Sequence, residues 1–569
     1  MGKEMERNML LAFVITLVIM VVWIRLIGPA VGPQQPAQEP SGAVTTQVAE
    51  PEREAGRPVE AEEPAATPAA KVDLPAEKEK ARDVVMDTPL VQATFTTLGA
   101  RVKSIKLKEP YEGVDIVPPS EDEERRLPLD MTLHKYVGGY LPNELNFEVQ
   151  KNGRTLKFKR DLGNGLLVTK EFRFNRDNYD IEMTVGIENQ GAEMVYVGED
   201  EEPSYTLWWG PGIETMESDR YSRTAFTAIN DGGSVYKYEG RVRSVEVYRN
   251  LSWFGLKSRY FLIAIAPLAD KPSIGQVLPM EAKEIAIESL ASSFRLNPGE
   301  TKENEYVIYA GPQDMARLKD VGRDLGMERA VNFGWFDGFS KILLKILKFC
   351  HKVVPNYGVG IIVLTIIVRM ALYPLTHKSM QSMNKMKDLQ PEIAKLKEKY
   401  KDNPQELNKR TMAFYKEQGV NPMGGCLPMM LQMPIWIALF RVYNGAIELR
   451  GAPFIWWITD LSEPETIATL PFSLPFFKDE VHVLPLLMAG AMFLQQKLTS
   501  PGGAASSDQQ RMMAIIFPVM FGLLFYHMPS GLCLYIFVST MLYFVQQMVT
   551  NKLKHSKPET QSAQKALKK

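Results

Sequence analysis

The feature that most constrains this chain is a set of long apolar runs in its second half. The run from residue 358 to 380, GVGIIVLTIIVRMALYPLTHKSM, is the most informative, because it carries Arg369 well before its polar end. A membrane-spanning helix needs about 20 mainly apolar residues, and a charged side chain within it costs about 2.5 to 3.5 kcal/mol on insertion scales. A protein that keeps such a residue usually turns it toward a cavity or a partner. We therefore expect an α-helical polytopic membrane protein in which Arg369 has a function.

Six segments are expected to span the membrane. The first lies in residues 1–28, where Lys3 and Arg7 precede an apolar stretch. A cleaved signal peptide is the alternative, but the stretch is longer than a signal-peptide core and no small-residue cleavage pattern follows at once, so we favour a retained anchor. The other five expected spans, of which the third and fourth are short, are residues 357–376, 423–445, 482–498, 512–528 and 530–550.

The charges of the connecting loops predict the orientation of these spans. Residues 377–420 hold ten Lys or Arg against six Asp or Glu, whereas residues 446–480 hold two against six. The tail, residues 551–569, holds six Lys against one Glu. Because basic loops stay in the cytoplasm, six spans with both termini and residues 377–420 inside satisfy every loop.

Two regions precede the bundle of spans. Residues 29–80 are rich in Pro, Ala and Glu and predict a disordered linker. Residues 84–327 show period-2 alternation broken by turn residues, which is typical of a large antiparallel β-sandwich. Trp208 and Trp209 in this region could line a sugar site, and packing in a core or interface is the alternative.

Residues 333–353 predict an amphipathic helix. Four lysines recur at spacings of four, three and four and so share one helical face: Lys341, Lys345, Lys348 and Lys352. This pattern is typical of a helix lying in the membrane interface. Docking onto the β domain is the alternative.

The basic loop, residues 377–420, predicts a helical hairpin. Two helix-prone stretches are separated by Asp402, Asn403 and Pro404, which supply a capping residue and a proline at a first helical position. Its first stretch combines soft apolar and basic side chains that could bind incoming helices or anionic lipid: Met380, Met383, Met386, Lys385 and Lys387. Packing between the two hairpin helices is the alternative for the methionines.

Polar residues stranded in the spans are the candidate functional residues. Thr365 lies one turn before Arg369 and shares its helical face. Arg369 lies about 12 Å along a helix from Lys378, so snorkelling to the cytoplasmic interface is the alternative to lining a groove. Pro374 lies between them and is expected to end or kink the helix.

No carboxylate is expected to compensate Arg369. The last five spans contain no acidic residue, apart from Glu448 just past the span at 423–445. A cation without a fixed partner attracts acidic or polar groups. The other polar positions in these spans are Gln432, Gln495 and Gln496.

The sequence contains no motif for catalysis or for a cofactor. A nucleophile elbow, P-loop, dinucleotide fingerprint and zinc motif are all absent from the second half of the chain. Six scattered histidines and three cysteines supply no metal site and no disulfide framework. We therefore expect neither an enzyme nor a metal or cofactor site.

Several long motifs resemble one family. The segments IVRMALYPLT, NPMGGCLPMMLQMPIWIALF, MFLQQKLTSP and FPVMFGLLFYHMPSGLCLYIFVSTMLYFVQQ occur in order. They resemble the YidC/Oxa/Alb family of membrane protein insertases, in the Gram-negative form with a large periplasmic domain. The resemblance implies an anchor, a periplasmic β-supersandwich, and a five-helix insertase core with a cytoplasmic helical hairpin.

The resemblance also implies roles for individual residues. The family core encloses a groove that is open to cytoplasm and lipid and has an arginine at its centre, which Arg369 matches. Thr365 matches a substrate-contact position, and Gln432 and Gln496 match polar groove positions. Tyr535 matches the first of two aromatic positions in the last span, whereas Ile536 departs from the second.

The expected function is insertion and folding assistance for integral membrane proteins of the bacterial inner membrane, with or without the Sec translocon. Expected partners are nascent membrane proteins, the Sec translocon and its accessory subunits, membrane lipids, and the ribosome and signal recognition particle pathway, with no direct nucleic-acid contact. A small-solute transporter and a membrane-anchored carbohydrate-binding protein are the alternatives. Small-solute transporters ordinarily have internal repeats, and this chain shows no repeat between its halves.

Overall fold

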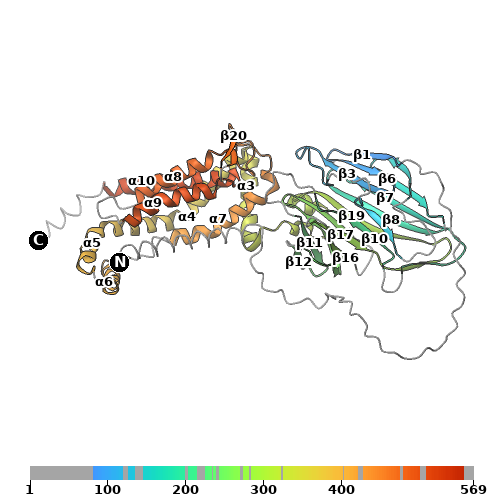
Figure 1. Cartoon of the computed structure of the whole chain (residues 1–569), viewed down its shortest axis with the longest axis horizontal. Helices are drawn as coiled ribbons and strands as arrows, with labels where there is room; N and C mark the ends of the chain where they lie inside the picture. Colours follow the sequence, from blue (N-terminus) through green and yellow to red (C-terminus); the bar gives the residue numbers. More distant parts are fainter. Residues whose placement is uncertain are drawn as a thin grey trace, which may run out of the picture. The chain divides into compact units, whose positions relative to one another are not determined.

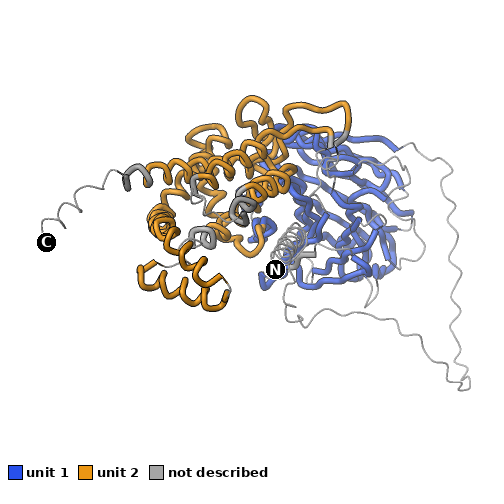
Figure 2. Tube along the Cα trace, turned by 60° about the vertical axis from the view of Figure 1, so that its left-hand side comes forward, with its two compact units in different colours: residues 1–331 blue, residues 332–569 orange. Residues whose placement is uncertain are grey.

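The computed structural model describes residues 81–555, apart from 119–125, 135–144, 164, 199–202, 214–223, 234, 239–241, 269–272, 281–283, 322–323, 402, 421–426, 475–477 and 500–507. The expected anchor 1–28, the linker 29–80 and most of the tail 551–569 lie outside the described residues, and these expectations stay predictions. The chain divides into two compact units, residues 1–331 and 332–569 (Figure 2). We call them the β unit and the helical unit and describe each by itself.

The β unit is built from antiparallel strands between residues 83 and 312. A three-stranded sheet has the order β1 (Asp83–Asp87), β2 (Val91–Thr96), β3 (Arg101–Leu107). A five-stranded sheet has the order β13 (Glu246–Arg249), β16 (Ile274–Pro279), β17 (Ile285–Leu290), β10 (Tyr205–Trp209), β4 (Asp130–Leu133). A two-stranded sheet joins β18 (Phe294–Leu296) and β9 (Val195–Val197).

The largest sheet has nine strands (Figure 1). Its order is β12 (Val235–Tyr238), β11 (Ala225–Asn230), β14 (Leu251–Lys257), β15 (Phe261–Pro267), β19 (Thr301–Pro312), β8 (Asp180–Asn189), β7 (Leu166–Phe174), β6 (Thr155–Asp161), β5 (Glu148–Asn152). Along β7 buried side chains alternate with less buried ones, which is the period-2 pattern of the sequence. Every residue of β15 is buried, so this strand is covered on both faces.

The β unit ends in two short helices, α2 (Met315–Asp320) and η3 (Met327–Ala330). The helical unit begins with η4 (Gly334–Phe336) and α3 (Asp337–Val353). Its remaining elements in chain order are α4 (Tyr357–Asp388), α5 (Gln390–Lys399), α6 (Pro404–Glu417), α7 (Leu427–Gly445), η6 (Ile447–Leu449), the hairpin β20 (Ala468–Leu474) and β21 (Lys478–Val481), α8 (Leu484–Thr499), α9 (Asp508–Leu524) and α10 (Ser530–His555).

Pro374 does not end the helix, because α4 continues for 32 residues to Asp388. Proline lacks the backbone N–H that would donate to the carbonyl of Met370, and the regular helix on both sides of residue 374 continues in spite of this loss. The hydroxyl of Thr376 donates to two other carbonyls, those of Leu372 and Tyr373. The helix ends instead before Pro391, in the first turn of α5. The end of the membrane span at residue 376 stays a prediction.

Two of the expected spans meet the length and apolarity of a membrane helix within the described residues, α4 and residues Ser530–Thr550 of α10. In α9 the apolar part, Ile515–Leu524, is shorter. The helix α8 has 16 residues, which is about 24 Å of helix against a hydrocarbon core of about 30 Å. Six spans are therefore not confirmed and stay a prediction.

The amphipathic helix α3 is present, and its apolar face packs within the helical unit. Leu343, Leu344 and Leu347 are buried, and α3 lies against α4 and α7. Lys348 pairs with Glu448 at 2.9 Å. The exposed apolar side chains of α3 are Phe339, Ile342, Phe349 and Val353, and these side chains are open to a membrane surface.

Candidate functional site: the polar face of the last helix

The guanidinium of Arg369 is held by the last helix of the helical unit. Its Nε and Nη2 donate to the hydroxyl of Ser539 at 3.0 and 2.6 Å. Its Cζ lies 5.6 Å from the ring centroid of Tyr543, which is within cation–π distance. Among the described residues, the side-chain contacts of Arg369 are thus to a hydroxyl and an aromatic face.

A second polar contact lies one turn earlier on the same helix. Gln432 on α7 donates its amide N–H to the hydroxyl of Tyr535 at 2.6 Å. Tyr535, Ser539 and Tyr543 are spaced by four residues along α10, so they share one helical face. We call these three residues the α10 stripe. Arg369 of α4 and Gln432 of α7 therefore both contact the α10 stripe.

The other predicted groove residues lie differently. Thr365 is fully buried, and its hydroxyl donates to the carbonyl of Ile361 in its own helix at 2.6 Å. This contact uses the hydrogen of the hydroxyl, so the oxygen of Thr365 can still accept a hydrogen bond. Gln496 is half-buried on α8, and no recorded polar contact to a described residue joins it to the α10 stripe.

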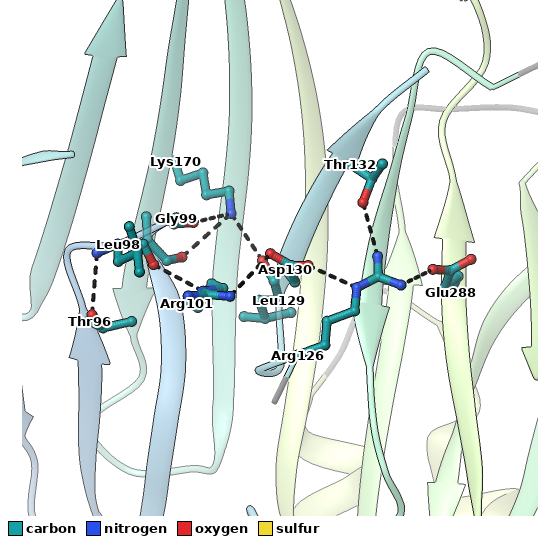
Figure 3. Close-up of polar contacts among 11 residues, drawn as sticks. Thr96, Leu98, Gly99, Arg101, Arg126, Leu129, Asp130, Thr132, Lys170 and Glu288 are labelled. Atoms are coloured by element: carbon teal, nitrogen blue, oxygen red, sulfur yellow. Dashed lines mark hydrogen bonds and ion pairs between the residues drawn. The ribbon is translucent and has the colours of Figure 1, made fainter. Parts of the chain in front are cut away.

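The β unit holds a second group of buried charges (Figure 3). Arg126 donates from Nε to Asp130 at 2.8 Å, from Nη1 to Glu288 at 2.8 Å, and from Nη2 to Thr132 at 3.1 Å. Its Cζ lies 5.0 Å from the ring centroid of Trp208. Each nitrogen of this guanidinium therefore has an acceptor within the β unit.

Further cations converge on the same aspartate. Asp130 is fully buried, and Arg101 approaches it at 3.8 Å. Lys170 is fully buried as well and donates to the carbonyls of Gly99 and Leu129 at 2.8 and 3.0 Å. Burial lowers the pKa of Lys170 from its ordinary 10.5 to about 7, while the charge of Asp130 acts in the opposite direction. We call Arg101, Arg126, Asp130, Lys170 and Glu288 the charged cluster of the β unit.

The geometry of this cluster favours a structural role for the tryptophans. Trp209 is fully buried, and the recorded cation–π contact of Trp208 is to Arg126 of the same unit. Trp208 is itself buried, so its ring is not open to a stacking sugar. Core and interface packing therefore explains both tryptophans.

Comparison with known proteins decides the family. A family model described as the 60Kd inner membrane protein matches residues 349–558, and one described as the YidC periplasmic domain matches residues 83–346. The membrane protein insertase YidC of Pelobacter propionicus is 34% identical over 567 residues, with 96% of this chain and 99% of the relative covered. The chain belongs to the YidC family of membrane protein insertases.

Other YidC proteins extend the comparison. The insertase YidC of Geotalea daltonii is 31% identical over 572 residues and covers 96% of this chain and 99% of its own. A crystal structure of an active YidC insertase with its first transmembrane domain resolved is 20% identical, covers 84% of this chain and 93% of its own, and has a TM-score of 0.36. Membership of the YidC family means that the chain inserts proteins into the membrane and is not an enzyme.

The hairpin expected from the YidC resemblance is present between the end of α4 and α6. Asn403 caps α6 through a bond from the N–H of Glu406, and Pro404 is its first residue, as predicted. Ile393, Tyr415 and Val420 form a small core.

The methionines of the hairpin divide between the two explanations. Met386 packs against the hairpin core, which favours the packing alternative for this residue. Met380 is buried outside that core. Met383 is half-buried, Lys385 is exposed and Lys387 is half-buried.

Two residues of the site were missed from the sequence, Ser539 and Tyr543. Both are common side chains in an apolar helix, and neither carries a charge that marks it. Their signal is the spacing of four residues from Tyr535, which places all three on one face. That signal is usable only once Tyr535 has been chosen as the reference.

Proposed function

We propose that the chain passes the polar tail or short loop of an incoming hydrophobic segment along a groove lined by Thr365, Arg369, Gln432, Gln496 and Tyr535. The observation that carries this proposal is the environment of Arg369. Its guanidinium is oriented by Ser539 and Tyr543 and has no recorded carboxylate among the described residues. A cation held in that way keeps its attraction for an acidic visitor.

The size of this attraction is sufficient to matter. Two unit charges 4 Å apart attract by about 4 kcal/mol at an effective dielectric of about 20. The cost of a charge at the bilayer centre is about 2.5 to 3.5 kcal/mol on insertion scales. An acidic tail that meets Arg369 thus offsets much of the penalty of entering the apolar region.

The driving force comes from the segment itself. The second half of the sequence has no nucleotide-binding motif, whereas burial of apolar surface releases about 25 cal/mol per Å2. We propose that the segment first contacts the hairpin of residues 377–420, through Lys385, Lys387 and Met383. Its tail then enters the groove, and its apolar part moves into the lipid.

The proposed topology follows the charges of the loops. Residues 377–420 and both termini lie in the cytoplasm, and residues 84–327 lie in the periplasm of a bacterium with the chain in its inner membrane. The excess of basic residues in 377–420 and 551–569 supports this orientation. Nascent membrane proteins are the substrates, and the Sec translocon, the ribosome, the signal recognition particle pathway and membrane lipids are proposed partners.

The proposal is tested by Arg369→Ala and Arg369→Lys in the full chain reconstituted into liposomes. The substrate is a single-span protein with an acidic tail, and protease protection of the tail measures insertion. We expect Arg369→Ala to lower insertion about tenfold, equivalent to about 1.4 kcal/mol, and Arg369→Lys to keep most of it.

Two controls isolate the charge. Arg176→Ala removes an exposed arginine of the β unit and should leave insertion unchanged. The same substrate with its acidic residues replaced by amides should be much less sensitive to Arg369→Ala. Full insertion of the acidic substrate by Arg369→Ala would sink the requirement for a positive charge in the groove.

A further inference from the structure

An exposed tryptophan sits at the tip of a tight turn between α7 and α8. The side chain of Trp456 is 83% exposed and that of Ile455 is 46% exposed. The turn is closed by two backbone bonds, from the N–H of Phe454 to the carbonyl of Ile458 at 2.9 Å and from the N–H of Ile458 to the carbonyl of Ile455 at 3.1 Å. Trp456 has a φ of +50°, a left-handed conformation that a large side chain rarely adopts.

A hydrogen bond and a ring contact hold the turn against the first residues of α4. Asn356 caps α4 by accepting from the N–H of Val359, and its amide donates to the carbonyl of Phe454 at 3.0 Å. The ring of Phe454 lies so close to Gly358 that a Cβ there would stand 2.1 Å from Cδ2 of the ring. Only glycine at residue 358 permits this contact, so the turn lies against the start of α4.

Hydrogen bonds hold the same segment against the first residues of α10. Ser530 donates its hydroxyl to the carbonyl of Asp460 at 2.8 Å, and the N–H of Gly531 donates to the carbonyl of Leu461 at 2.9 Å. The N–H of Leu461 in turn donates to the carbonyl of Ala452 at 3.0 Å and closes the base of the segment. The turn is thus held at the beginnings of two helices.

Those two helices are the ones whose described residues are long and apolar enough to cross a membrane. Where α4 and α10 begin is therefore where the chain enters the bilayer. A tryptophan at this level matches the membrane interface, because its ring is apolar and its N–H is polar. The end of α3, immediately before α4, adds Phe349 and Val353, each 67% exposed.

We propose that the turn carrying Ile455 and Trp456 inserts into the interfacial layer of the bilayer and fixes the depth at which α4 and α10 enter it. The occupant of this surface is lipid, at the headgroup boundary of the leaflet where both helices begin. The exposed side chains are apolar and aromatic, and backbone bonds fix the turn that carries them. The inference rests on α4 and α10 crossing the membrane, as proposed above, and adds a lipid-binding surface outside the groove.

The test is fluorescence quenching of the full chain in liposomes. The chain has 8 tryptophans, so the difference between the unchanged protein and Trp456→Phe isolates the signal of Trp456. We expect Trp456→Phe to lose a component that is quenched by phospholipid brominated near the headgroup, and to lose less of the signal quenched by phospholipid brominated near the end of the acyl chain. The intensity that iodide in the aqueous phase quenches should be the same in the two proteins.

The outcomes are distinct. An unchanged lipid-quenched intensity in Trp456→Phe, or a loss confined to the iodide-quenched signal, would overturn the proposal, because Trp456 would then lie in water. Phenylalanine keeps an aromatic ring at the tip, and an unchanged circular dichroism spectrum confirms that the variant is folded. The quenching needs no substrate, so its failure would leave the role of Arg369 in insertion untouched, and the reverse also holds.

Discussion

Two arginines in this molecule are held in opposite ways. Arg126 in the β unit donates to two carboxylates and a hydroxyl, so its charge is compensated and its nitrogens are occupied (Figure 3). Arg369 in the helical unit has a hydroxyl and an aromatic ring as its recorded partners among the described residues. Both guanidiniums lie beside a ring, but among the described residues only that of Arg126 contacts a carboxylate.

We interpret this difference as one between an ion group that stabilises the β unit and a charge that is available to a ligand. The charge of Arg126 is neutralised by carboxylates of its own unit, so it has little attraction left for an added anion. A charge that is oriented by a hydroxyl and a ring is not neutralised by them, so it still attracts an added anion. Both sides of this comparison can be changed by substituting one partner or one charge at a time.

Removing the shared carboxylate of the β unit should have the largest effect. Asp130→Asn keeps the shape of the side chain and leaves Arg126 and Arg101 without their common counter-charge. Breaking a buried ion group in this way costs about 3 to 5 kcal/mol. We therefore expect the unfolding free energy measured in urea to fall by that amount. The measurement is intrinsic fluorescence of the full chain in detergent.

The matched control is Asp83→Asn, whose carboxylate pairs with Lys103 at 2.8 Å with both side chains about half exposed. Such surface pairs contribute about 0 to 1 kcal/mol. Equal effects of the two substitutions would contradict the view that the charged cluster of the β unit is structural.

Lys170 should make the stability of the β unit depend on pH. Its pKa is about 7 in the folded protein, chiefly because of burial, against 10.5 as its ordinary value. Between these values the unfolded chain holds a proton that the folded chain has released, so the unfolding free energy rises with pH, by at most about 1.4 kcal/mol per pH unit. Urea unfolding at several pH values above 7 measures this slope.

Lys170→Met is the variant that tests the assignment. It removes the titrating group and should flatten this part of the slope, although it also leaves the carbonyls of Gly99 and Leu129 without their donor. Lys159→Met, at a less buried position of the neighbouring strand β6, should keep the slope. The same slope in Lys170→Met and the unchanged protein would assign the pH dependence to other groups.

The sequence singled out Arg369 but not the side chains that contact it. A lone charge in an apolar run can be recognised from the sequence alone, because the apolar residues next to it make burying the charge costly. Ser539 and Tyr543 become recognisable only when α10 is placed against α4. The charged cluster was missed for the same reason, since Asp130, Lys170 and Glu288 lie on three strands far apart in the chain.

The fold was predicted best where the pattern is local. Period-2 alternation predicted the antiparallel strands, and Asn403 with Pro404 predicted the start of α6. The expectation that Pro374 could end the helix was wrong, because one missing backbone N–H was outweighed by the regular helix around it. The end of the membrane span at residue 376 stays a prediction.

Giving Arg369 a carboxylate should convert its site into one resembling that of Arg126. In Ser539→Asp the partner of the guanidinium becomes a counter-charge, and the attraction for an acidic tail falls. We expect insertion of an acidic-tail substrate to drop about tenfold, equivalent to about 1.4 kcal/mol, as in Arg369→Ala. Protease protection in liposomes measures it.

Ser539→Asn separates charge from size in that experiment. The amide has nearly the shape of the carboxylate and can still accept from Arg369, so insertion should stay within about threefold of the unchanged protein. Equal losses in Ser539→Asp and Ser539→Asn would mean that the hydroxyl position, and not an uncompensated charge, is what insertion requires.

The smallest expected effect concerns the aromatic partner. Tyr543→Leu removes the ring that lies 5.6 Å from Arg369, and a cation–π contact contributes about 0.5 to 1 kcal/mol at partly exposed sites. We expect the rate of insertion of the acidic-tail substrate to fall about twofold to fivefold. Tyr543→Phe keeps the ring face and should keep the rate. If leucine keeps the rate as well as phenylalanine does, the ring contributes nothing and Ser539 alone orients the guanidinium. The contact that distinguishes Arg369 from Arg126 would then be the neutral hydroxyl in place of carboxylates, and not the aromatic ring that lies beside each of them.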